Sequence, residues 1–174
     1  MRELQALFEV ENLLGDPRQV VVVPAGSAYR EYLDHAAYIC QPRRPFKAVE
    51  RMAFYCRGRI EREIPKIRHV VDEVEFSTSH VQDLRASDDP MAAGLATLIE
   101  QLLEAGPRQE GELFKVFLLT RPDDADTVRL EQPIINDTMD ASGRTTAWVM
   151  MQRYASLGAL QGARRTSELS DGSN

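Results

Sequence analysis

Cysteine is scarce in this sequence, with only Cys40 and Cys56 among 174 residues. Two cysteines are too few for a disulfide framework, and each lies in an apolar run, so we predict that both are reduced core residues. No apolar run reaches the roughly 18–20 residues that a membrane-spanning helix needs. The N-terminal residues carry acidic side chains where a signal peptide has an unbroken apolar region. We therefore expect a cytoplasmic protein that has no membrane partner.

Motifs for catalysis and cofactor binding are missing as well. The chain has no P-loop, no G-x-G-x-x-G and no G-x-S-x-G pattern, which argues against nucleotide-phosphate binding and triad hydrolysis. Its three histidines are far apart in sequence and neither cysteine forms a C-x-x-C pair, so we expect no structural zinc site. The sequence thus indicates no cofactor and no metal, and it favours a non-enzymatic function while leaving the question of catalysis open.

Positive charge is in the minority overall, because the chain has 21 basic and 27 acidic residues. Nine of the basic residues and only three acidic ones lie between Pro42 and Arg68, which leaves 12 basic and 24 acidic residues elsewhere. This asymmetry indicates one surface that prefers an anion on a body that repels anions. Pro42 and Pro45 also predict a stiff, exposed loop that presents Arg43 and Arg44.

Short β-branched and aromatic runs predict most of the secondary structure. We expect strands over residues 19–24, 37–40, 52–56 and 113–119, and a further strand over 145–151. The clearest helix covers residues 90–105, where an apolar stripe recurs at helical spacing. Without regular βαβ alternation, this pattern predicts an α+β fold, mostly antiparallel, with a small bent β-barrel and inserted helices. We expect one domain over residues 1–162 and a polar C-terminal tail over 163–174.

A family resemblance rests on two segments. These are MAFYCRGRIEREIPKIRHVVDEVEF and, after a helix, LFKVFLLTRPDDADTVRLEQPI, with the phrase Leu130-Glu-Gln-Pro133-Ile134. Over residues 19–154 this order of pieces resembles the PUA-like superfamily, which includes the ASCH and EVE domains. The resemblance implies a bent β-barrel that recognises RNA or a modified base in DNA through an aromatic-lined pocket. The chain lacks an alignable Thr-Lys-Glu set, so the resemblance does not imply the amidohydrolase activity of ASCH enzymes.

A non-catalytic nucleic-acid-binding module is the first functional hypothesis. Arginine forks pair well with phosphates, and an aromatic ring can stack an unpaired or flipped base. The alternative reading is that the arginines form salt bridges with the acidic remainder of the chain. The predicted binding residues are Tyr38, Arg43, Arg44, Lys47, Arg51, Tyr55, Arg57, Arg59 and Trp148, with Phe54 and Arg62 as further candidates.

Two other hypotheses remain open. A metal-dependent nuclease of a prokaryotic DNA-processing or defence system needs carboxylates around a divalent metal with a lysine nearby. Its nearest candidates are Asp72, Glu73 and Glu75, and Glu112 with Lys115. A protein-interaction or regulatory domain would use the acidic surface and the apolar stripe of the 90–105 helix, from Leu95 to Leu103, to meet a protein partner or a second copy of the chain. Core packing is the simpler reading of that stripe.

Overall fold

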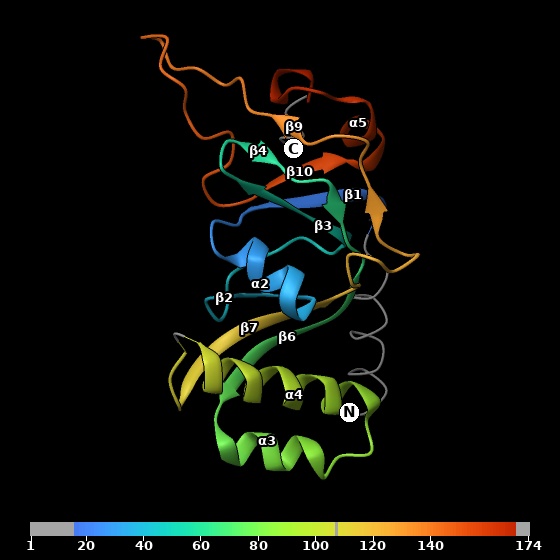
Figure 1. The fold of residues 1–174 in the computed structure, drawn as a ribbon, viewed down its shortest axis with the longest axis vertical. Coiled ribbons are helices and arrows are strands. Elements are labelled where there is room, and N and C mark those ends of the chain that lie inside the picture. The colour runs from blue at the N-terminus through green and yellow to red at the C-terminus, as the bar shows by residue number, and fades with distance from the viewer. Residues whose placement is uncertain (1–15, 107, 170–174) are drawn as a thin grey trace. The chain divides into compact units, whose positions relative to one another are not determined.

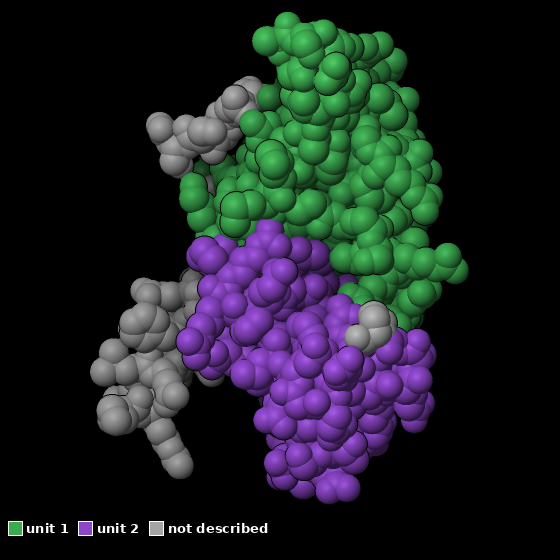
Figure 2. Space-filling model, turned by 90° about the vertical axis from the view of Figure 1, so that its left-hand side faces the viewer, with its two compact units in different colours: residues 1–36, 46–68, 119–174 green, residues 37–45, 69–118 purple. Residues whose placement is uncertain are grey.

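The computed structural model describes residues 16–106 and 108–169. These residues form two compact units, which are coloured separately in Figure 2. Among the described residues, unit 1 comprises 16–36, 46–68 and 119–169, and unit 2 comprises 37–45, 69–106 and 108–118. The prediction that residues 1–162 form one domain stays a prediction, and the regular structure expected over residues 4–14 lies outside the described residues.

Both units combine strands with helices, so the predicted α+β class is confirmed (Figure 1). The structure has a sheet that curls into a half-barrel and, in the described part of the chain, four α-helices. None of the described helices is long and apolar enough to cross a membrane. The finer prediction of a PUA-like barrel stays a prediction.

Unit 1 is built on a five-stranded sheet in the order β10-β1-β3-β4-β9. β1 and β3 pair in parallel, whereas the other three pairs are antiparallel. A parallel pair needs a long connection, which here contains helix α2 (Ala28–His35). The strands of this sheet are β1 (Asp16–Pro24), β3 (Val49–Cys56), β4 (Arg59–Ile60), β9 (Ile134–Ile135) and β10 (Arg153–Ser156).

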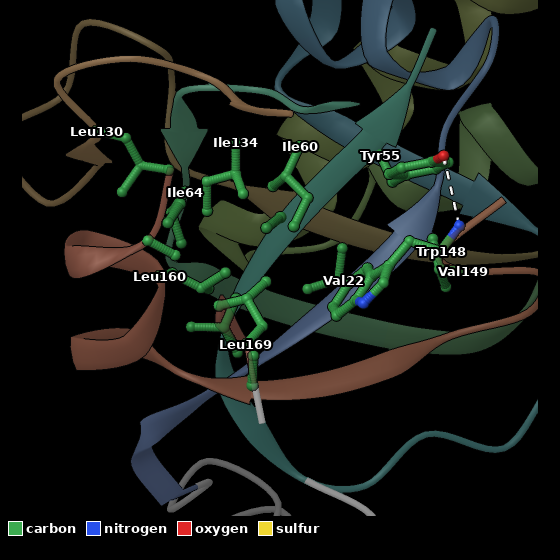
Figure 3. Close-up of a cluster of buried hydrophobic side chains, with 14 residues drawn as sticks. Val22, Tyr55, Ile60, Ile64, Leu130, Ile134, Trp148, Val149, Leu160 and Leu169 are labelled. Atoms are coloured by element: carbon green, nitrogen blue, oxygen red, sulfur yellow. Dashed lines mark hydrogen bonds between the residues drawn. The ribbon is translucent and has the colours of Figure 1, made fainter. Parts of the chain in front are cut away.

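The two faces of this sheet bury different side chains, because neighbouring residues of a strand point to opposite faces. Ala53 and Tyr55 of β3 belong to a cluster that helix α5 (Leu157–Gly162) completes with Leu160 (Figure 3). On alternate positions of β3, Phe54 is fully buried and stacks on Tyr32 of α2, with 4.6 Å between ring centroids. Both faces of β3 are therefore covered by apolar packing.

Pro65 divides the segment that follows Gly58 into separate strands. A two-stranded sheet pairs β5 (Glu63–Ile64) with β8 (Val128–Arg129), and β6 (Ile67–Phe76) begins only after the proline. A proline cannot donate to a sheet ladder, but its carbonyl accepts a hydrogen bond from Met52 N–H at 3.1 Å.

Unit 2 holds most of a three-stranded sheet in the order β2-β7-β6, with β2 (Ala37–Cys40) and β7 (Glu112–Leu119). Helices α3 (Thr78–Arg85) and α4 (Pro90–Ala105) pack against it. The stripe of α4 lies in the core of this unit, which confirms core packing as its role. The stripe consists of Leu95, Leu98, Ile99, Leu102 and the partly buried Leu103.

Two stretches differ from the sequence-based expectations. Residues 145–151 form no regular strand; Trp148 and Val149 are buried in the unit 1 core without a ladder partner, whereas Met150 and Met151 are exposed. Residues 163–169, expected as the start of a polar tail, belong to unit 1 and pack into it. Ala163, Thr166 and Leu169 are buried there, and η1 (Thr166–Glu168) is a turn of 3-10 helix.

Candidate nucleic-acid interface

The predicted binding residues are divided between the two units. Unit 2 contains three of them: Tyr38, Arg43 and Arg44. Unit 1 contains the other six: Lys47, Arg51, Tyr55, Arg57, Arg59 and Trp148. Each group is described within its own unit.

The loop that carries Arg43 and Arg44 is tied to the unit 2 sheet. Arg43 has a left-handed backbone with φ 60°, and its Nε donates to Glu73 Oε1 at 2.6 Å. Arg44 donates from Nη1 to the hydroxyl of Tyr38 at 3.2 Å, while its carbonyl accepts from Lys115 Nζ at 3.1 Å. Arg43 keeps 83% of its side chain exposed, so it combines an ion pair with access to solvent.

Tyr38 is buried, with 3% of its surface exposed, and its ring lies tilted against Phe117 at 5.9 Å between centroids. Burial raises the pKa of its hydroxyl to about 12. Arg44 counters this only in part, through its positive charge and its hydrogen bond. A stacking platform needs an exposed ring face. Tyr38 therefore packs in the protein interior and offers no such face to a base.

The residues of the nuclease hypothesis form ion pairs rather than a metal cage. Lys115 lies 2.6 Å from Asp72, and Glu73 is the partner of Arg43. Glu75 and Glu112 are exposed on β6 and β7. Among the described residues, no group of three or more His, Cys, Asp or Glu side chains is placed to hold a metal ion. No observation thus favours metal-dependent cleavage.

Lys47 and Arg51 make local contacts in unit 1. The Lys47 N–H donates to the Tyr154 hydroxyl at 2.9 Å, and its ammonium lies 5.2 Å from the centre of that ring. Arg51 donates from Nη1 to the carbonyls of Ile64, at 3.3 Å, and Asp126, at 2.6 Å. Arg51 therefore joins β3 to β5 and to the loop before β8, which is a structural role.

Tyr55 and Trp148 belong to the unit 1 core (Figure 3). The Tyr55 hydroxyl accepts hydrogen bonds from Asn136 Nδ2 at 2.9 Å and from Trp148 N–H at 3.4 Å. Each of the two rings is 8% exposed, and the Arg153 guanidinium lies over Trp148 at 4.8 Å. The structure brings these two aromatic residues together, but it uses them for packing.

Arg57 stands at the tip of the hairpin between β3 and β4. Cys56 pairs with Arg59, so the loop has two residues, and both have positive φ: 52° at Arg57 and 73° at Gly58. This is the pattern of a type I′ turn, which favours Asn-Gly. Arg57 is exposed, and its side chain has no hydrogen bond or ion pair with any described residue. Its guanidinium is therefore presented to solvent.

Arg59 begins β4 and is held by a buried acid. Its Nε donates to Glu61 Oε1 at 2.9 Å, and the same oxygen accepts from the Cys56 thiol at 3.2 Å. The hydrogen bond to Glu61 and the negative charge of Glu61 raise the pKa of Arg59. Burial and the hydrogen bond to Glu61 raise the pKa of Cys56 to about 11. Cys56 is thus a neutral thiol at physiological pH and not an activated nucleophile.

Two further arginines lie at this sheet edge and are absent from the predicted set. Ile135 of β9 pairs with Arg59 on one side and forms a parallel bridge with Arg165 on the other. Its N–H donates to the carbonyl of Arg164 at 2.9 Å. The only sequence signal was the Arg164-Arg165 dipeptide itself, because about 30 residues separate it from β9.

Comparison with known proteins finds no protein-family model that matches the chain, and no significant match among curated proteins or solved structures. The resemblance to the PUA-like superfamily therefore rests on the sequence segments that suggested it.

Proposed function

We propose that this chain is a non-catalytic nucleic-acid-binding protein of the cytoplasm that contacts phosphates through the β3–β4 hairpin of unit 1. The PUA-like resemblance supports recognition of RNA or of a modified base in DNA. The local excess of basic residues between Pro42 and Arg68 supports an anionic ligand. Arg43, on the unit 2 loop, is a second exposed candidate for phosphate contact.

The observation that carries this proposal is the conformation of Arg57. A left-handed backbone costs a residue with a Cβ atom about 1 kcal/mol, which Gly and Asn largely avoid. At this turn position the chain has an exposed arginine with φ 52° and no bonded side-chain partner in the described part of the chain. Local strain of this kind is common where function requires it. Because the Arg57 guanidinium forms no bond that stabilises the described part of the fold, phosphate binding accounts for an arginine at this turn.

The rings assigned to a base-binding pocket contribute less to this proposal. Tyr38, Phe54, Tyr55 and Trp148 are each less than 10% exposed. Stacking of a base on any of them requires displacement of its present neighbours. We therefore place the main contact at the arginines rather than at an aromatic pocket.

The test is binding of labelled single-stranded and duplex oligonucleotides, measured by fluorescence anisotropy over a salt series. We expect affinity to fall steeply between about 50 and 200 mM salt, because phosphate contacts release counterions. Arg57→Asn keeps a residue suited to the turn and removes the guanidinium, so it should weaken binding without loss of stability. Arg121→Asn, at an exposed arginine in the acidic loop before β8, is the matched control. Absence of binding at about 50 mM salt would overturn the proposal.

A further inference from the structure

The segment after α5 returns the chain to the edge of the unit 1 sheet. Arg165 lies opposite Ile135, which in turn lies opposite Arg59. Side chains at directly paired positions project from the same face of a sheet. Arg59, Ile135 and Arg165 therefore form one row, and their Cα atoms span two strand spacings, or about 10 Å.

This row faces away from the cluster of Figure 3. The neighbouring residues Ile60 and Ile134 are fully buried in that cluster, so the alternate positions point outward. Ile135 is 51% exposed and Arg165 is exposed. The side chain of Arg165 has no hydrogen bond or ion pair with any residue that the structure describes.

Hydrogen bonds to Asp137 anchor the segment beside β9. The Asp137 carboxylate accepts from the Ser167 N–H at 2.9 Å, from the Ser167 hydroxyl at 2.6 Å and from the Thr166 hydroxyl at 3.0 Å. These bonds lower the pKa of Asp137. Thr166 and Leu169 are also buried, at 1% and 5% exposed. Arg164 and Arg165 are thus held at the sheet edge rather than on a free tail.

We propose that residues 163–168 complete the nucleic-acid surface of unit 1, with Arg165 as a phosphate contact in line with Arg59. This inference rests on the proposed function. The segment supplies to this row a cation that the basic stretch from Pro42 to Arg68 does not contain.

The composition of the row also points to the class of ligand. It presents guanidinium groups and one aliphatic side chain, with no aromatic ring on which a base could stack. A surface that contacts only phosphates favours the form with the higher charge density. Duplex DNA carries about one charge per 1.7 Å of its axis, against about one per 3.4 Å for each strand. The ligand of this row is therefore the backbone of a duplex, bound without base specificity.

The deciding experiment compares Arg165→Ala with Arg121→Ala, which removes the same charge from the same unit but from a loop rich in aspartate. Binding of a labelled duplex is followed by anisotropy between about 50 and 200 mM salt. We expect Arg165→Ala to weaken binding and to reduce the salt slope by about 1, as for one lost phosphate contact. Arg165→Lys should keep most of the affinity, and Arg121→Ala should match the unmodified protein.

The possible results separate the two proposals. If Arg57→Asn weakens binding but Arg165→Ala behaves like Arg121→Ala, the role of residues 163–168 is wrong and the proposed function stands. If the unmodified protein binds no duplex and no single strand, both proposals fall. Tighter binding of a single strand than of a duplex of the same sequence would overturn the ligand class. Equal binding of a polyglutamate chain would identify an acidic polypeptide as ligand and would also overturn it.

Discussion

Arg59 donates a hydrogen bond from Nε to Oε1 of Glu61, and the two residues differ sharply in exposure. The side chain of Arg59 is 41% exposed, whereas that of Glu61 is 6% exposed. The buried carboxylate thus fixes the direction of a surface guanidinium and cancels part of its charge. It also links the arginine to the core through the thiol of Cys56.

Glu61→Gln should therefore lower the stability of the protein and raise its affinity for a duplex. The neutral amide keeps an acceptor oxygen but loses the charge, so we expect the free energy of unfolding to fall by about 1 kcal/mol. Affinity for a duplex should rise, because one negative charge beside the arginine row is removed. Urea unfolding and anisotropy measure the two effects. Glu131→Gln, at an exposed glutamate of unit 1, makes the same charge change, and equal effects of both variants would contradict the prediction.

Removal of Asp137 should release the segment that carries Arg165. Asp137→Ala eliminates three accepted hydrogen bonds, so we expect faster hydrogen exchange at the Ser167 amide and duplex affinity as low as that of Arg165→Ala. Asp140→Ala is the control, since Asp140 accepts comparable bonds from Ser142 and Arg144 within its own turn. Unchanged exchange at Ser167 would show that burial of Thr166 and Leu169 alone holds the segment.

The Asp137 carboxylate also predicts how the attachment of residues 163–168 to the rest of unit 1 depends on pH. The pKa of Asp137 is lowered from its ordinary value of 3.8, mainly by the hydrogen bonds from Ser167. A lowered pKa in the folded state means that the stabilisation is present above the ordinary pKa and is lost as pH falls through the folded pKa. Protection of the Ser167 amide should therefore persist at neutral pH and decline only below about pH 3.8.

The two cysteines predict a loss of stability at high pH. Burial raises the pKa of Cys40 and of Cys56 from 9.0 to about 11 in each case. Because the folded state favours the neutral thiol, this contribution is complete below pH 9 and is lost as pH rises from 9 to about 11. We expect the free energy of unfolding, measured in urea, to fall less over this range in the double variant Cys40→Ala plus Cys56→Ala than in the unmodified protein. An equal fall in both proteins would assign the loss to other groups, such as Tyr38.

The pair of Lys115 and Asp72 should respond unequally to loss of either partner. The side chain of Lys115 is 9% exposed and that of Asp72 is 71% exposed, so Asp72→Ala removes the carboxylate partner of a buried ammonium, which keeps its bond to the Arg44 carbonyl and its contact with the Phe117 ring. We expect this to cost about 1–3 kcal/mol in urea unfolding. Lys115→Met should cost less, because it removes the buried charge and keeps a similar volume.

Glu75→Ala, at an exposed glutamate of the same strand, is the control for Asp72→Ala and should change stability little. The same three variants also test the nuclease hypothesis. Magnesium-dependent cleavage that disappears with Asp72→Ala and Lys115→Met, but not with Glu75→Ala, would restore that hypothesis and assign the pair a catalytic role.

Local features of the fold were predictable because they depend on neighbouring residues. The apolar stripe of α4 and the Asp89 cap before Pro90 are local patterns, and both appear in the structure. The same holds for the strand over 52–56 and the turn at Gly58. The expected strand over 145–151 did not form: Trp148 and Val149 enter the core without a ladder partner, whereas Met150 and Met151 are exposed. Apolar content does not by itself predict strand pairing.

The sequence by itself determined where positive charge is concentrated along the chain and indicated most of the short segments that form strands and helices. Tertiary structure alone decided which of those charges remain available. It buried Tyr38, Tyr55 and Trp148, bound Arg51 to backbone carbonyls, and left Arg57 exposed at a strained turn with no bonded side-chain partner among the described residues. It also brought Arg165 beside Ile135, across 30 residues of sequence. Such contacts are set by strand pairing and core packing between distant segments, and no local pattern encodes them.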